Sequence, residues 1–227
     1  MLSSQYEIKN GIAVIKNKKK IIESSLFFFC TDLTSVIIPS SVIEIGNGAF
    51  ACCSRLSSIA IPDSVTIIGD DAFRDCTGLT SVVIPDSVTE IGEYAFIGCT
   101  GLTSIVIPSS VTKIGKCAFE GCTGLTSIVV SEGNEVYDSR NNCNAIIETS
   151  SNRLIKACHN TIIPDTVTEI GWRAFENCSG LTSVVIPDSV KKIENNAFEG
   201  CSRLTSIVVS EGNKVYDSRN NCNAVIE

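Results

Sequence analysis

A pattern of 23 residues repeats along the chain, and residues 79–101 state it most clearly as LTSVVIPDSVTEIGEYAFIGCTG. The pattern keeps its register, because one leucine position recurs every 23 residues at Leu33, Leu56, Leu79, Leu102 and Leu125, and again at Leu181 and Leu204. A proline and a phenylalanine recur with the same spacing. Self-similarity at a period of about 20 to 50 residues is typical of a solenoid, in which each repeat forms one coil of a stack.

Within one coil, the residue pattern predicts a short strand, a turn and a return path. Pro85 would end the strand, because proline has no amide N–H to donate to a strand ladder. Gly92 would adopt a φ that other residues resist, and residues 95–99 would form a short helical or 3₁₀ turn on the outer arc. About eight side chains per coil should be buried, which in this coil are Leu79, Val82, Ile84, Val88, Ile91, Ala95, Phe96 and Cys99.

A single coil of this size cannot bury enough apolar surface to offset the entropy of ordering it, so the coils must share their core with neighbours. The sequence therefore predicts a repeat solenoid: a parallel β stack of short strands, with turns and 3₁₀ or short helical segments on the outer arc.

The spacing of the repeats divides the chain into five parts of one solenoid domain. They are a degenerate N-terminal capping coil (1–32), four regular coils (33–124), an expanded coil (125–157), two regular coils (158–203) and a truncated expanded coil (204–227). In the expanded coil, AIIE and RLIKA flank the turn signal TSSN, which predicts a β-hairpin in place of the outer arc. Because the second expanded coil is still incomplete at Glu227, we expect the chain to be a fragment or a truncated frame.

The repeated pattern also points to a family. Leu-x-x-Val-x-Ile-Pro, followed by Val-x-x-Ile-Gly-x-x-Ala-Phe-x-x-Cys, resembles the BspA-like branch of bacterial leucine-rich repeats over nearly all of residues 10–227. Pro85 and its equivalents stand where other leucine-rich repeats end the strand motif with Asn or Cys. The resemblance implies a surface or secreted protein that binds host matrix proteins or other cells, and it implies no catalytic residues.

Composition narrows the classes of partner. A net charge of −7 and a pI near 4.9 argue against nucleic acid, whose phosphates require clustered Lys and Arg. No apolar run approaches the roughly 18 residues of a membrane span. The opening MLSSQYEIKN does not have the pattern of a signal peptide, so a cytoplasmic location stays open beside the surface location that the resemblance implies.

One charged run stands out against this acidic background. KNKKK at 16–20 is expected to be a solvated end of the capping coil, and contact with an anionic surface is the alternative.

Seven of the twelve cysteines share one position in the coil: Cys30, Cys53, Cys76, Cys99, Cys122, Cys178 and Cys201. Stacked equivalents point in parallel, which makes disulfide geometry awkward and predicts a ladder of buried free thiols. The chain has no CxxC pair and a single histidine, His159, so the pattern argues against zinc. We predict no metal site and no cofactor.

Two constellations only faintly suggest chemistry. Asp138, Arg140 and Asn142 echo a calcium loop, but an arginine stands where a ligand belongs. His159 follows Cys158, yet that cysteine takes a core leucine position and should point inward. With no G-x-S-x-G motif either, the sequence predicts that the chain is not an enzyme.

The outward side of the strands remains as the candidate site. If Leu79, Val82 and Ile84 point inward, Ser81 and Val83 point outward, and every coil repeats this pair. The predicted partner-binding residues are Ser35, Ile37, Ser58, Ala60, Ser81, Val83, Ser104, Val106, Ser127, Val129, Ser183, Val185, Ser206 and Val208. A contiguous apolar row usually marks a contact surface, whereas the alternative is that good strand formers were copied by duplication.

These observations favour a non-enzymatic protein-binding or adhesion module that contacts a partner, such as a host matrix or cell-surface protein, through the solenoid surface. The alternative is a structural scaffold that associates with itself end to end, without a dedicated ligand.

Overall fold

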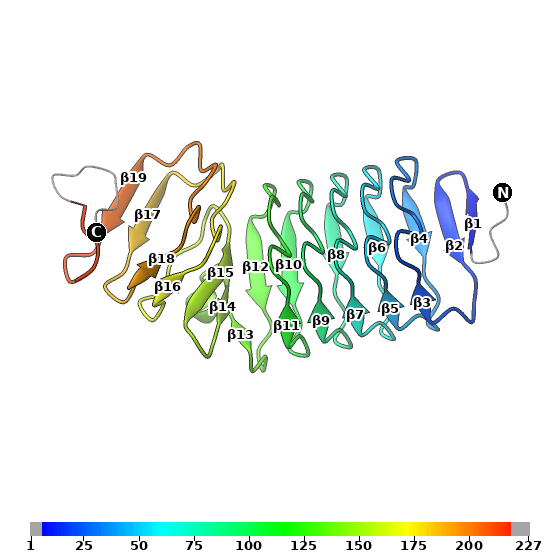
Figure 1. Cartoon of the computed structure of the whole chain (residues 1–227), viewed down its shortest axis with the longest axis horizontal. Helices are drawn as coiled ribbons and strands as arrows, with labels where there is room; N and C mark the ends of the chain where they lie inside the picture. The colour runs from blue at the N-terminus through cyan, green and yellow to red at the C-terminus, as the bar shows by residue number, and fades with distance from the viewer. Residues whose placement is uncertain (1–5, 219–227) are drawn as a thin grey trace. The chain divides into compact units, whose positions relative to one another are not determined.

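The computed structural model describes residues 6–218, and the predicted repeat solenoid is confirmed (Figure 1). The chain divides into two compact units, Met1–Leu125 and Thr126–Glu227, which are described separately below. In each unit the coils pair mainly through parallel strands, because equivalent residues of successive coils meet in register.

Each coil of unit 1 contributes a strand to a first row: β2 (Ile12–Ile15), β4 (Ser35–Ile37), β6 (Ser58–Ala60), β8 (Ser81–Val83) and β10 (Ser104–Ile107). The pairs β2–β4 and β6–β8 are parallel, and Ser58 lies opposite Ser81. One further strand, β1 (Tyr6–Lys9), pairs antiparallel with β2. The first coil is therefore covered on its first-row side by a hairpin, where the sequence predicted a degenerate coil.

A second row of two-residue strands runs along the return path of unit 1. It comprises β3 (Ile21–Ile22), β5 (Glu44–Ile45), β7 (Ile67–Ile68), β9 (Glu90–Ile91) and β11 (Lys113–Ile114), which form one five-stranded parallel sheet. In each strand the isoleucine at the second position points toward the core, and Ile45, Ile68 and Ile91 are fully buried.

Unit 2 contains two sheets and one short helix. A five-stranded sheet has the order β13 (Tyr137–Asp138), β14 (Ala145–Glu148), β15 (Arg153–Ala157), β16 (Glu169–Ile170) and β18 (Lys192–Ile193). A parallel pair is formed by β17 (Ser183–Ile186) and β19 (Ser206–Val209). The remaining elements are β12 (Ser127–Val130) and the 3₁₀ helix η1 (Arg140–Asn142).

The hairpin of the expanded coil is formed by β14 and β15, which pair antiparallel. β15 then continues the second row, because Leu154 pairs in parallel with Ile170 of β16. At its end the Ala157 N–H donates to the Ala174 carbonyl at 2.9 Å, a bond that outer-arc residues make in regular coils. The hairpin thus replaces a second-row strand as well as part of the arc, which is more than the sequence indicated.

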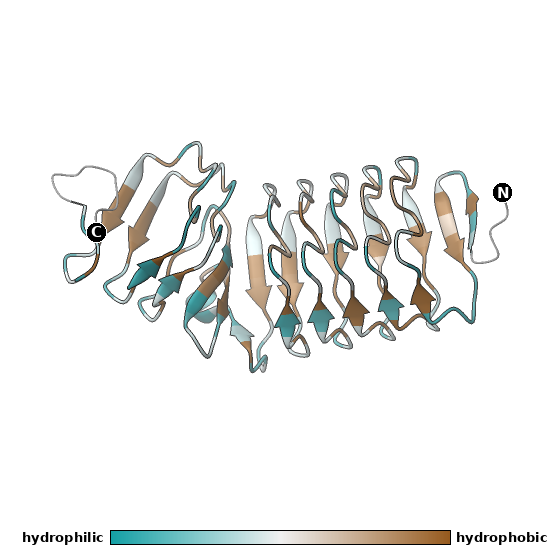
Figure 2. Cartoon of the chain, viewed as in Figure 1, coloured by the Kyte–Doolittle hydropathy of each residue, from teal (hydrophilic) through white to brown (hydrophobic). Residues whose placement is uncertain are grey.

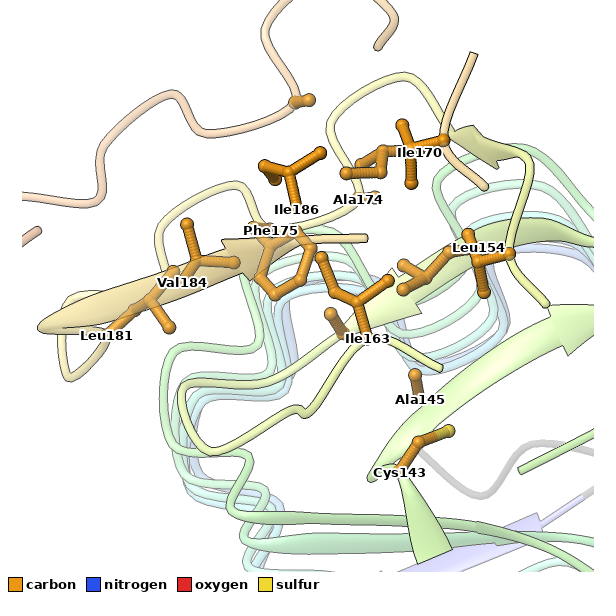
Figure 3. Close-up of a cluster of buried hydrophobic side chains, with 14 of the residues drawn as sticks. Cys143, Ala145, Leu154, Ile163, Ile170, Ala174, Phe175, Leu181, Val184 and Ile186 are labelled. Atoms are coloured by element: carbon orange, nitrogen blue, oxygen red, sulfur yellow. The ribbon is translucent and has the colours of Figure 1, made fainter. Parts of the chain in front are cut away.

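The core of each coil follows the sequence pattern closely. All eight side chains predicted to be buried in residues 79–101 are at most 7% exposed. The phenylalanines of unit 1 form a continuous stack, with ring centroids 5.1–5.4 Å apart and interplanar angles of 5–11°. Tyr6 closes this stack at 4.6 Å from Phe27. In unit 2, Phe175 shares one buried cluster with Leu154 and Ile163 (Figure 3).

The outer arc is built from turns, so the predicted short helix is wrong there. In one coil the N–H groups of Asp71, Phe73 and Asp75 donate to carbonyls of the next coil, at 2.7–2.8 Å. The intervening N–H groups donate within their own coil, three residues back. This alternation requires left-handed backbone at Asp71 (φ 54°) and Asp75 (φ 53°), which a helix would not permit. Among the described residues, η1 is the one helical segment.

Gly92 is needed for a reason other than the predicted φ, since it is absent from the positive-φ positions. A Cβ on Gly92 would lie 2.5 Å from the Asp70 nitrogen and 2.6 Å from the Gly69 carbonyl carbon, both in the preceding coil. Backbone atoms at that distance cannot give way as a flexible side chain could. The glycine therefore permits the close approach of one coil to the next.

The inward face can be tested by truncation. We expect Phe96→Ala to lower the free energy of unfolding by about 3–5 kcal/mol, because the ring is fully buried between its neighbours. Glu93→Ala, on the exposed side of the same arc, should change it by less than about 0.5 kcal/mol. Urea unfolding of both variants measures the difference, and equal effects would show that the assigned inward face is wrong.

The close approach at Gly92 gives a second prediction. Gly92→Ala should lower the free energy of unfolding by about 1–3 kcal/mol, because the coils must separate to admit the methyl group. The matched control is Glu23→Ala at the equivalent, exposed position of the first coil, which should stay within about 0.5 kcal/mol. A neutral Gly92→Ala in thermal or urea unfolding would contradict the steric argument.

Candidate interaction surface

The outward residues of the first-row strands form an exposed row in each unit, here called the outward row. In unit 1 it consists of Val14, Ile37, Ala60, Val83 and Val106, and in unit 2 of Val129, Ile162, Val185 and Val208. The large side chains among them are 43–78% exposed. Figure 2 shows that the hydrophobic colour lies along these strands, while the second row carries more hydrophilic positions. In each unit, the outward row is thus apolar surface that the fold does not bury.

The serines beside the outward row are exposed or half-exposed, as predicted: Ser35, Ser58, Ser81 and Ser104 in unit 1, and Ser127, Ser183 and Ser206 in unit 2. All fourteen predicted residues therefore lie on the accessible side of their strands. At a strand spacing of about 4.8 Å, the five positions in unit 1 would span about 20 Å. Partner binding by these residues remains a prediction.

Two members of the outward row were missed from the sequence. Val14 lies opposite Ile37 in the parallel β2–β4 pair, but Lys16 occupies the proline position of its coil and hides the motif. Ile162 is 78% exposed and belongs to the coil that begins with Cys158 in place of leucine. The spacing of 23 residues, applied without the motif, would have found both.

The threonines next to the serines serve the stack. The Thr80 hydroxyl donates to the Ser57 carbonyl at 3.2 Å, and the Thr103 hydroxyl donates to the Thr80 carbonyl at 3.4 Å. Each bond joins a residue to the coil before it, and these hydroxyls stabilise the repeat. The outward row and its serines carry no charge, so they suit an uncharged partner surface.

The charged side chains of unit 2 are largely engaged with one another. Arg153 pairs with Glu169 at 3.0 Å and also with Glu194, which stands where other coils have glycine. Glu194 accepts from Lys192 at 2.8 Å and from the Trp172 backbone N–H at 2.7 Å. The Lys192 hydrogen bond is the largest cause that lowers the pKa of Glu194 to about 2. These groups form an internal ion-pair network on the second row.

The predicted thiol ladder is confirmed. The Cys53, Cys76, Cys99 and Cys122 thiols each donate at 3.1 Å to a phenylalanine carbonyl of the preceding coil. Every cysteine in the described part of the chain is free, whereas Cys222 lies outside that part. Burial raises the pKa of Cys53 to about 12, so the ladder holds protonated thiols with little nucleophilic character.

The two constellations set aside in the sequence are occupied by structural bonds. The Cys158 thiol donates to Asn160 Oδ1 at 2.8 Å, and burial raises its pKa. The Asp138 carboxylate accepts from Arg140 at 2.6–3.0 Å, so it is engaged in an ion pair within its own loop. Within residues 6–218, no three His, Cys, Asp or Glu side chains are grouped as a metal site would require.

The chain belongs to the BspA type leucine rich repeat family, whose model matches residues 6–126 and 150–224 in six copies. No curated protein matches the chain. Among the described residues, no helix has the length and apolar character that crossing a membrane demands.

Several solved structures are similar to the chain. One is a leucine rich cell surface protein of Faecalibacterium prausnitzii, with 28% identity and a TM-score of 0.68 over 91% of this chain and 75% of that one. A leucine rich repeat protein of T. pallidum has 26% identity and a TM-score of 0.56, covering 88% of this chain and 87% of that one. A leucine-rich repeat protein of Bacteroides ovatus has 26% identity and a TM-score of 0.55, covering 95% and 54%.

The buried thiols predict how stability depends on pH. Burial raises the pKa of Cys76 above its ordinary value of 9.0, so the unfolded chain loses this proton first as the pH rises. The free energy of unfolding should hold below about pH 9 and then fall, by up to about 1.4 kcal/mol per pH unit for each such thiol.

Urea unfolding between about pH 7 and pH 10.5 measures this slope. Cys76→Ala removes one titrating thiol and leaves the lysines and tyrosines in place, so its slope above pH 9 should be shallower than that of the unaltered chain. Identical slopes would show that the ladder thiols ionise as readily in the folded state as in the unfolded state.

Proposed function

We propose that this chain is a non-enzymatic binding or adhesion module that contacts a protein partner through the outward row. The observation that carries the proposal is the alignment of exposed, uncharged β-branched side chains on successive coils, with Val83 75% and Ile37 54% exposed. Single exposed valines are ordinary, but a contiguous row at strand spacing offers one continuous apolar contact.

The interior supports a binding role over catalysis. The side chains with nucleophilic chemistry that the sequence singled out are protonated thiols engaged by carbonyl or amide oxygens, as Cys99 and Cys158 are. Every coil repeats the same contacts, so the fold presents a long periodic surface in each unit. Such surfaces are what repeat proteins use to bind extended partners.

The family and its relatives support a location outside the cell. The Faecalibacterium prausnitzii structure is described as that of a leucine rich cell surface protein. We infer the same location, or secretion, for this chain, with a host matrix or cell-surface protein as its partner. An uncharged face would suit such a partner at physiological ionic strength, because apolar contact is little screened by salt.

A charge placed in the outward row tests the proposal. Val106→Asp should weaken binding to immobilised matrix proteins or to intact cells by about tenfold or more, because the carboxylate would be desolvated in the contact. Ser109→Asp is the matched control: it adds the same charge to the same coil, at the position that Asp63 and Asp86 occupy in the neighbouring coils.

Melting temperatures of both variants should match that of the unaltered chain, since both sites are exposed. Unchanged binding by the Val106→Asp variant would remove the outward row as the contact. If light scattering instead shows a mass that rises with concentration and falls in the Val106→Asp variant, the row serves self-association, which is the scaffold alternative.

A further inference from the structure

We propose that the first coil of unit 1 binds the surface of an anionic lipid bilayer through the lysines of residues 16–20 and the exposed pair Phe28 and Phe29. This assignment is independent of the outward row and of the partner proposed above. The three arguments for it concern the exposure of the two rings, the backbone that holds one of them, and the charge of the coil.

The two rings are exceptional among the aromatic side chains. Of the nine phenylalanines, six are buried and Phe198 is half-buried, whereas Phe28 is 56% and Phe29 66% exposed. Their ring centroids lie 6.3 Å apart, so they form a single aromatic patch on the arc of the first coil. Because Phe27 already fills the core position of this coil, neither ring is needed for the stack.

The backbone at Phe29 is left-handed, with φ at 59°. The same arc position is held in later coils by Cys52, Asp75, Gly98 and Gly121. The stack imposes this conformation, because the Phe29 N–H donates to the Ala51 carbonyl at 2.8 Å. A bulky residue is unfavourable there, and a strained position that displays a ring to solvent points to contact with a ligand.

The charge of the first coil is opposite to that of the rest of the chain. Residues 6–24 contain five lysines and two glutamates, whereas the remaining residues contain 13 basic and 23 acidic side chains. Lys16 lies 3.7 Å from Glu7 and Lys19 lies 3.2 Å from Glu23. Lys18 and Lys20 have no ion-pair partner among residues 6–218, so positive charge is left over at this end of unit 1.

The lysines and the rings belong to one coil at the end of unit 1. Residues 16–20 join β2 to β3, and β3 is the terminal strand of the second-row sheet (Figure 1). Apolar side chains are exposed on the same coil, with Ile8 48% and Ile21 43% accessible. The N-terminal end of unit 1 therefore combines surplus lysines with exposed apolar and aromatic groups.

A bilayer fits this combination better than a protein pocket does. The lysines lie in the turn before β3 and the rings lie on the arc after it, so a pocket would have to enclose both sides of the coil. A broad surface can meet both at once, with lysines at the anionic headgroups and rings at the boundary with the acyl chains. Each lysine near such a surface strengthens binding by about fivefold, and insertion of the rings adds to this.

Co-sedimentation of the full chain with lipid vesicles tests the proposal. We expect binding to phosphatidylcholine vesicles that contain about 30% phosphatidylserine, little binding to phosphatidylcholine alone, and weaker binding as salt is raised. The double variant Lys18→Gln, Lys20→Gln should bind about 25-fold more weakly. The double variant Phe28→Ser, Phe29→Gly should lose about tenfold or more.

The aromatic variant should fold, because glycine already occupies the position of Phe29 in later coils and suits its φ. Ile97→Ser is its matched control, at the position of Phe28 three coils further on, and should leave vesicle binding unchanged. Equal binding to neutral and anionic vesicles would overturn the proposal. So would full binding by the aromatic variant, which would reduce the contact to charge alone. If the aromatic variant fails to melt cooperatively, the exposed lysine variant decides the outcome.

Discussion

The hydrogen bonds between successive coils are the constraint on which this structure depends. A 23-residue coil has no closed core and no complete ladder of its own, so its backbone groups find partners in the coils beside it. The strands do this in two rows, and the arc does it at alternate residues, as the Phe73 N–H does with the Ala95 carbonyl. Side chains extend the scheme, since Thr80 and Cys76 both donate to carbonyls of the preceding coil.

This constraint separates inward positions from outward ones. A side chain between two coils must match its equivalents, and the stacked phenylalanines and the thiol ladder are the result. Even the glycines answer to the neighbouring coil, because a Cβ on Gly92 would strike its backbone. Outward positions carry no such demand, so they can hold an uncharged row on the strands, an ion-pair network around Glu194, or exposed rings at Phe28 and Phe29. Function on this scaffold belongs to those positions.

The two places where the repeat changes are also the places where the surface changes. In the first coil the proline position is held by Lys16 and the left-handed arc position by Phe29, which gives that end charge and aromatic surface. In the expanded coil, β15 supplies the bonds that a regular coil would supply, and the buried Lys156 ammonium lies 3.5 Å from the Glu176 carbonyl that an arc N–H would otherwise meet. The stack tolerates variation where the acceptors of the next coil are still satisfied.

The amino-acid sequence by itself determined the period, the eight inward side chains of each coil and the outward direction of Ser81 and Val83, because strand alternation and a 23-residue register are properties of one coil. It also indicated the free thiols. Only the tertiary structure decided that the arc is a series of turns, that Gly92 is required by contact, and that Val14 and Ile162 complete the outward row. These features depend on the distance and register between coils, which residues far apart in the chain set jointly and which no single repeat contains.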